Sequence, residues 1–180
     1  LYVAIDTPDL AKAQHLAGQV RHHVGGLKLG LEFFCANGHH GVHEMMKFGL
    51  PIFLDLKLHD IPNTVSKAAV EVGNLGVSML TVHAAGGSAM IQATRHALED
   101  RFGEARPIVV AVTVLTSIDQ ETLIQTGVGE TPDAQVLRLA RMAGEAGADG
   151  FVCSSREIRQ VRENLDPGFQ IVTPGIHMPM

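Results

Sequence analysis

Short apolar segments alternate with stretches of helical periodicity along the whole chain, and this alternation constrains the fold more than any other feature. Apolar segments with the length of strands occupy Tyr2–Ile5, Gly26–Leu29, Ile52–Leu56, Met79–His83, Ile108–Val114, Gly150–Cys153 and Phe169–Val172. Such alternation is typical of repeated strand–helix units, in which helices cover a parallel sheet. We therefore expect an α/β protein with a parallel sheet.

The number of units favours a barrel. A (β/α)8 TIM barrel has eight strands and about 250 residues, whereas this chain offers seven strands in 180 residues. We interpret residues 1–180 as a single α/β-barrel domain that is truncated before its eighth βα unit and so lacks its C-terminal end. An open doubly wound sheet is the alternative.

Two of the intervening helices carry recognisable start signals. Thr131 and Pro132 form a cap and a first-turn proline. Apolar residues then recur at helical spacing, at Val136, Leu139, Ala140 and Ala143. Ser154 and Glu157 have the spacing of a capping box, which predicts a helix that contains Ile158, Val161 and Leu165.

Composition excludes several classes of protein. Hydrophobic residues make up 46% and charged residues 18% of the chain, which is typical of a globular protein. The net charge is −5 and Lys and Arg form no dense run, so a nucleic-acid partner is not expected. The longest apolar stretch is far too short to cross a membrane. Cys35 and Cys153 are too few for a disulfide framework, and a reducing cytoplasmic location is the simplest interpretation.

The third strand segment carries the most informative motif, in which Asp55, Lys57 and Asp60 follow one another closely. In a regular strand Asp55 and Lys57 point to one side and the neighbouring leucines to the other. Asp60 follows in the turn before a helix that Pro62 can begin. An ordinary salt bridge on an edge strand would explain the same residues. Catalytic sites of α/β barrels, however, lie where strands end, and this motif lies at such an end.

Two more charged residues lie in the same phase on neighbouring strands. Asp6 closes the first strand, and Lys28 lies between two leucines in the second. Each one alone is most simply a surface charge. Together with Asp55 and Lys57 they predict that three adjacent strands bring charged groups to one barrel mouth.

The sequence closely resembles the orotidine 5′-phosphate decarboxylase family over essentially its whole length. The residues that carry the resemblance are Ala4–Asp6, Leu27–Gly30, Asp55–Thr64, Thr81–Ala84, Val114–Ser117, Val152–Ser154 and Val172–Ile176. The most specific of these is Asp55–Thr64, because sister barrels that act on keto-sugar phosphates share its acidic and basic residues but not the Ile61–Thr64 continuation.

The resemblance implies a reaction and a set of roles. The reaction is the cofactor-free decarboxylation of orotidine 5′-monophosphate to uridine 5′-monophosphate in de novo pyrimidine synthesis, with no metal. The resemblance gives the catalytic roles to Lys28, Asp55, Lys57 and Asp60, and substrate binding to Asp6, Ile61, Thr64, Ser117, Pro174 and Gly175. It also implies a homodimer, in which Asp60, Ile61 and Thr64 reach the partner's site.

The residue types fit this reaction. Loss of carbon dioxide from a pyrimidine carbon leaves a carbanion, and a fixed lysine such as Lys57 can stabilise that charge and then donate a proton. Asp55 would repel the departing carboxylate.

Two other functions remain open on the sequence alone. A metal-dependent aldolase or epimerase of the sister barrels would use Asp55 and Asp60 as ligands. A non-catalytic fragment or binding module is the other alternative, because the family binds phosphate with segments after its seventh and eighth strands that this sequence lacks.

Two histidines have no assigned role. His177 stands where the family usually has an arginine. His83 ends the fourth strand and could contact the site or bond within the core.

Overall fold

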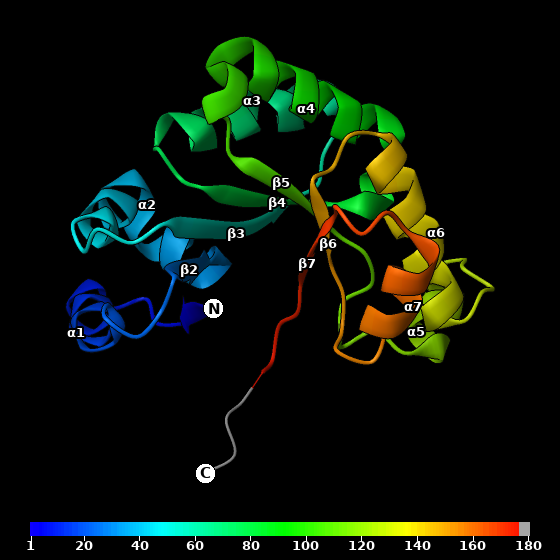
Figure 1. Cartoon of the computed structure of the whole chain (residues 1–180), viewed down its shortest axis with the longest axis horizontal. Helices are drawn as coiled ribbons and strands as arrows, with labels where there is room; N and C mark the ends of the chain where they lie inside the picture. The colour runs from blue at the N-terminus through cyan, green and yellow to red at the C-terminus, as the bar shows by residue number, and fades with distance from the viewer. Residues whose placement is uncertain (177–180) are drawn as a thin grey trace.

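The computed structural model describes residues 1–176 as seven parallel strands that curl into a half-barrel, with the helices on its convex side (Figure 1). The strands are β1 (Tyr2–Ile5), β2 (Gly26–Gly30), β3 (Ile52–Leu58), β4 (Met79–His83), β5 (Ile108–Val112), β6 (Gly150–Val152) and β7 (Gln170–Val172). The α-helices are α1 (Leu10–Val20), α2 (Leu31–Met46), α3 (Pro62–Asn74), α4 (Ser88–Phe102), α5 (Gln120–Gln125), α6 (Pro132–Glu145) and α7 (Ile158–Asn164). Two short 3₁₀ helices, η1 (Ala84–Gly86) and η2 (Gly103–Ala105), flank α4.

The strand order decides between the two expected architectures. Strands lie in the sheet in the order in which they occur in the chain, from β1 to β7, and every pair is parallel. A doubly wound sheet reverses its order at a switch point, and this sheet does not. The barrel prediction is therefore confirmed, and within residues 1–176 β1 and β7 form the two edges of the sheet.

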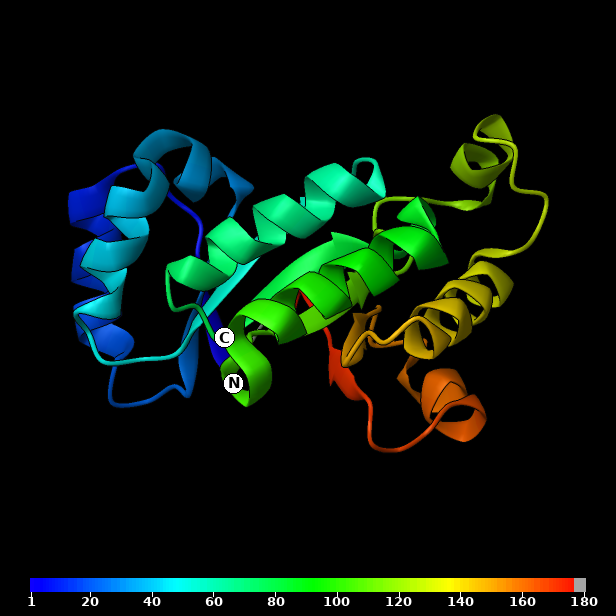
Figure 2. The same ribbon diagram turned by 90° about the horizontal axis from the view of Figure 1, so that it is seen from above.

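Two apolar clusters lie on the two faces of the sheet. The larger one fills the space between the sheet and the helices and includes Leu29, Leu54 and Phe151, all fully buried or nearly so. The smaller one, which contains Phe53 and Val110, lies on the concave face. Side chains alternate across a strand, so Phe53 and Leu54 face opposite layers, as the sequence predicts. Figure 2 shows α3 and α4 side by side over the convex face.

Both predicted helix-start signals form hydrogen bonds in the structure. At α6, Thr131 caps the helix by accepting a hydrogen bond from the N–H of Ala134 at 3.3 Å, and Pro132 occupies the first turn. Ahead of α7, the Glu157 carboxylate accepts the N–H of Ser154 at 2.6 Å, which is one of the two bonds of the predicted capping box. A single turn at residues 155–157 follows, and α7 begins directly after it at Ile158.

Five strands differ in length from their predictions, and β3 and β5 differ the most, by two residues each. β5 ends at Val112, two residues earlier than expected, and the next residue, Thr113, donates both its N–H at 3.3 Å and its hydroxyl at 2.8 Å to the carbonyl of Val152. β3 continues to Leu58, where the chain pairs again with Val82 of β4 after an irregularity.

No helix in residues 1–176 is long and apolar enough to cross a membrane.

Candidate active site

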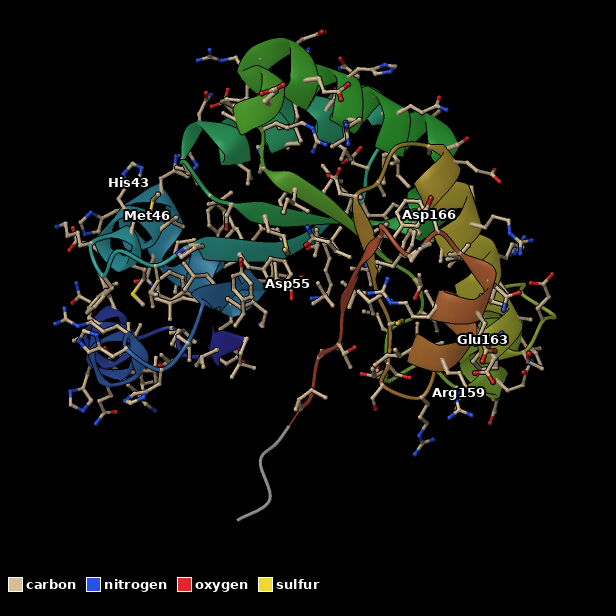
Figure 3. All side chains as sticks on the ribbon, viewed as in Figure 1. His43, Met46, Asp55, Arg159, Glu163 and Asp166 are labelled. Atoms are coloured by element: carbon tan, nitrogen blue, oxygen red, sulfur yellow. The ribbon has the colours of Figure 1, made fainter. Side chains whose placement is uncertain are left out.

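Charged side chains from three adjacent strands meet at the carboxyl edge of the half-barrel. Asp6 directly follows β1, Lys28 lies on β2, and Asp55 and Lys57 lie on β3. The register pairs Gly30 of β2 with Asp55 of β3. Lys28, two residues before Gly30 on the same face of β2, therefore lies next to Asp55 along the sheet. Figure 3 shows Asp55 on the concave side of the sheet, away from the helices. The predicted gathering of charges at one mouth is therefore present.

The charges alternate in sign around Asp55. The ammonium Nζ of Lys57 donates to Asp55 Oδ2 at 2.8 Å, and the Nζ of Lys28 lies 3.9 Å from the same oxygen. On its other side, Lys28 Nζ lies 3.5 Å from Asp6 Oδ1. Asp55 is the most enclosed, with its side chain 13% exposed, against 68% for Asp6. This row of acid, base, acid and base is most exposed at its two ends, Asp6 and Lys57, and Lys28 and Asp55 between them are more enclosed.

The backbone of Lys57 is unusual. Its φ of 53° lies in the left-handed region, and no other non-glycine residue of residues 1–176 has a positive φ. At this point the pairing of β3 with β4 shifts, from Leu54 opposite Leu80 to Leu58 opposite Val82. A lysine in this conformation costs roughly 1–2 kcal/mol, and such bulges often redirect a side chain beside an active site.

A buried threonine on β4 connects the two central residues. The hydroxyl of Thr81 donates to Asp55 Oδ1 at 2.8 Å and accepts the backbone N–H of Lys57 at 2.9 Å. Thr81 is fully buried. The sequence analysis gave Thr81 no role in the site. A usable signal was present, because Thr81 is a polar residue in a mostly apolar strand and lies on the same side of that strand as His83 at its end.

Two histidines lie beside the charged row. The rings of His59 and His83 stand with their centroids 5.4 Å apart. Burial lowers the pKa of His83 below its ordinary value, and the nearby charges of His59 and Lys57 lower it further, while Asp55 acts in the opposite direction. The neutral imidazole is therefore favoured, so His83 adds little positive charge beside Lys57 near neutral pH.

The second aspartate of the motif lies outside the charged row of this chain. Asp60 is exposed, and its Oδ1 accepts the N–H of Ile61 at 2.6 Å. Ile61, 64% exposed, and Thr64, also exposed, follow at the start of α3. These three side chains thus form an outward-facing group next to the mouth.

The remaining predicted residues lie in loops that follow other strands at the same edge. Ser117 is exposed in the segment between β5 and α5. Pro174 and Gly175 follow β7 and are also exposed, and Gly175 has a φ of 74°. His177 lies outside the described residues.

No group of three or more His, Cys, Asp and Glu side chains in residues 1–176 is arranged to hold a metal ion. Figure 3 places His43 on α2, away from Asp55.

Comparison with known proteins assigns the chain to a family. The model of the orotidine 5′-phosphate decarboxylase / HUMPS family matches residues 1–180. The chain belongs to this family.

The sequence relatives agree with that assignment. The chain is 58% identical over 182 residues to orotidine 5′-phosphate decarboxylase of Sphingopyxis alaskensis and 52% identical over 176 residues to that of Novosphingobium aromaticivorans. Each match covers 98% of this chain and 76% of the relative.

Solved structures of similar proteins agree as well. Orotidine 5′-phosphate decarboxylase of Lactobacillus acidophilus, 36% identical, superposes with a TM-score of 0.86 over 98% of this chain and 81% of that one. An uncharacterised conserved protein of Geobacillus kaustophilus, 34% identical, reaches 0.90 over 96% and 82%. The decarboxylase of Pyrococcus horikoshii, 22% identical with a TM-score of 0.80 over 99% and 80%, shares the fold.

Proposed function

We propose that this chain decarboxylates orotidine 5′-monophosphate to uridine 5′-monophosphate in pyrimidine synthesis, without a cofactor. The observation that carries the proposal is the row of Lys28, Asp55 and Lys57, joined by contacts of 3.9 Å or less at the carboxyl edge of a barrel of this family. No observation favours the aldolase or epimerase alternative.

Lys57 is the proposed proton donor. As the bond between the ring carbon and the carboxylate breaks, carbon dioxide leaves and the electron pair stays on the ring carbon. The ammonium of Lys57, held by Asp55 at 2.8 Å before substrate enters, stabilises that charge and then transfers a proton to the carbon. The lysine is left neutral and regains its proton from solvent.

Repulsion between Asp55 and the substrate carboxylate is a smaller contribution. Two like charges about 4 Å apart repel by roughly 4 kcal/mol at an effective dielectric of about 20. That energy corresponds to about a thousandfold in rate, whereas enzymes lower barriers by as much as ~23 kcal/mol. Stabilisation of the carbanion and binding energy from remote substrate groups must supply the larger part.

Four residues around the mouth are proposed to bind other parts of the substrate. Asp6 would accept a hydrogen bond from a ribose hydroxyl, and its 68% exposed carboxylate is free to do so. Ser117 would bond to the pyrimidine ring, and Pro174 and Gly175 would line the pocket near the base and phosphate. Support for these roles is their position in loops after β1, β5 and β7, at the same edge of the sheet.

The decisive experiment follows the loss of orotidine 5′-monophosphate by ultraviolet absorbance with a chelator present. We expect turnover by the native chain and a loss of about a thousandfold or more in Lys57→Ala, because the main electrostatic group is gone. Lys47→Ala is the matched control, since Lys47 pairs with Glu44 on the surface of α2. Turnover that survives in Lys57→Ala, or that the chelator abolishes, would contradict the proposal.

A homodimer is part of the proposal, with Asp60, Ile61 and Thr64 completing the partner's site. Its support is the resemblance together with the exposure of all three side chains beside the mouth. Lys57→Ala and Asp60→Ala, each inactive alone, should regain about a quarter of native activity after subunits are exchanged, because half of the dimers are mixed and each has one intact site. Two inactive variants that stay inactive when mixed would exclude sharing.

We also place the enzyme in the cytoplasm. The support is a chain with two cysteines, Cys35 exposed and Cys153 buried, and no disulfide between them. Cell fractionation with immunodetection tests this location.

A further inference from the structure

We propose that Thr81 is a positioning residue that sets the geometry of Asp55 and Lys57 for the reaction. The inference rests on the proposed function for its catalytic consequence, while its structural part concerns the shape of the site alone. Thr81 is completely buried on β4, on the side of the strand that faces the barrel interior.

The hydroxyl of Thr81 has a single permitted orientation. A hydroxyl offers one hydrogen and two acceptor positions. The backbone N–H of Lys57 is only a donor and occupies an acceptor position at 2.9 Å. The hydroxyl hydrogen is therefore directed to Asp55 Oδ1, 2.8 Å away.

Because Thr81 bonds to one oxygen of Asp55, the two carboxylate oxygens have different partners. Thr81 occupies Oδ1, and Oδ2 is left to the ammonium groups of Lys57, at 2.8 Å, and Lys28, at 3.9 Å. A carboxylate held at one oxygen cannot rotate freely about its terminal bond. Thr81 therefore fixes the direction in which Asp55 presents its negative charge to both lysines.

The same hydroxyl holds the strained backbone of Lys57. The N–H of Lys57 sits where the pairing of β3 and β4 shifts, and it finds its partner in the side chain of Thr81. Without this partner the left-handed conformation, with φ of 53°, would have less to hold it in place. The Lys57 ammonium would then lose its fixed direction toward the reacting carbon.

Other buried threonines make a different kind of bond. Thr94 donates to the carbonyl of Met90 within α4, and Thr113 donates to the carbonyl of Val152, each at 2.8 Å. These bonds satisfy the hydroxyl but touch no charged side chain. The contact of Thr81 with the carboxylate is what distinguishes a positioning role from simple burial.

Three variants test the inference: Thr81→Val, which keeps the shape and removes the hydroxyl, Thr81→Ser, which keeps the hydroxyl, and Thr94→Val as the matched buried control. We expect kcat of Thr81→Val to fall about 10- to 100-fold, as loss of a bond to a charged group implies, with KM and the Kd for uridine 5′-monophosphate changed less than about threefold. Thr81→Ser should stay within about threefold of native, and Thr94→Val should be unchanged. A native kcat in Thr81→Val, or equal losses in Thr81→Val and Thr94→Val, would overturn the role.

Crystal structures of Thr81→Val and Thr81→Ser give a second reading that does not depend on turnover. We expect Thr81→Val to show a rotated Asp55 carboxylate or a Lys57 backbone outside the left-handed region, and Thr81→Ser to keep both. Unchanged Asp55 and Lys57 in Thr81→Val would overturn the inference. If the native chain fails to turn over orotidine 5′-monophosphate, the proposed function falls, and these structures still decide the positioning by Thr81.

Discussion

Asp55 and Lys57 are held by contacts that favour function over local stability. Lys57 adopts a left-handed backbone that costs roughly 1–2 kcal/mol, and Asp55 keeps a carboxylate that is 13% exposed. The ion pair between them, together with Thr81, offsets these costs. Strain that the surroundings maintain in this way is typical of a catalytic position.

Gly30 lies beside the charged row and leaves space there because it has no side chain. A Cβ added to Gly30 would lie 3.7 Å from both Asp6 Oδ1 and Lys28 Nζ, in contact with the charged row but without a clash. Gly30→Val should therefore fold normally while its methyl groups fill the space that substrate needs. We expect KM to rise by about tenfold or more, equivalent to at least ~1.4 kcal/mol of lost binding, in steady-state kinetics.

The control for Gly30→Val is Gly18→Val on α1. A Cβ at Gly18 would also have its nearest neighbour at 3.7 Å, here Phe48, but it lies away from the site. A variant Gly30→Val with native KM would show that substrate does not approach β2 at this point.

Sequence reasoning at the residue scale found the charged residues of this site but missed Thr81. Charges at strand ends are visible because few structural roles explain them. A threonine in an apolar strand is common, and its bond to Asp55 depends on the register of β3 against β4. Regular alternation correctly placed Lys57 beside Asp55, but it did not indicate the irregular pairing and the left-handed backbone at Lys57.

Strands β6 and β7 pair so closely that one of them requires glycine. A Cβ at Gly150 would clash with the backbone carbonyl of Gln170 and lie 2.8 Å from its Cβ. Gly150→Ala must push the two strands apart. We expect a loss of about 2–3 kcal/mol in the free energy of unfolding, measured by urea denaturation.

Gly129→Ala is the comparison for this change, because a Cβ there meets open space and φ is not in the left-handed region. Equal stabilities of the Gly150→Ala and Gly129→Ala variants would contradict a close β6–β7 contact.

The sequence predicted elements well where local chemistry alone sets them. α6 begins at its cap and proline as expected because both signals act on the helix backbone itself. The Ser154–Glu157 capping pattern likewise forms its glutamate bond, and α7 begins at Ile158 after one turn. A capping pattern in sequence does not fix the exact residue at which the regular helix begins.

A salt-bridge network at the amino end of the strands connects α4 with the segments that precede β5 and β6. Asp149, just before β6, accepts from Arg95 of α4 and from Arg106, which precedes β5, each at 2.7 Å. It also accepts the N–H of Val109 at 2.8 Å. Burial alone would raise the pKa of Asp149, but the bonds from Arg106 and Val109 and the charges of both arginines lower it below its ordinary value.

The lowered pKa sets the sign of a pH effect on stability. The folded protein binds a proton to Asp149 less readily than the unfolded chain does, so the contribution is fully present above the ordinary carboxyl pKa of about 4. It is lost as pH falls from about 4 through the folded value.

Asp149→Asn should test this network. We expect a loss of about 3 kcal/mol near neutral pH, because two arginines lose their charged partner, and a smaller difference from native below about pH 4. Urea denaturation at several pH values measures both. Asp100→Asn on the exposed face of α4 is the control, and a constant difference between Asp149→Asn and native at every pH would contradict the linkage.

By itself the sequence determined the class of fold and the residues that carry charge to the mouth, because hydrophobic periodicity and charges at strand ends are local properties. Only the tertiary structure decided the sequential strand order, the bulge at Lys57 and the bond from Thr81 to Asp55. Each of these depends on how one strand lies against its neighbour. Such register is set by packing over the whole sheet, and no single segment of the sequence contains it.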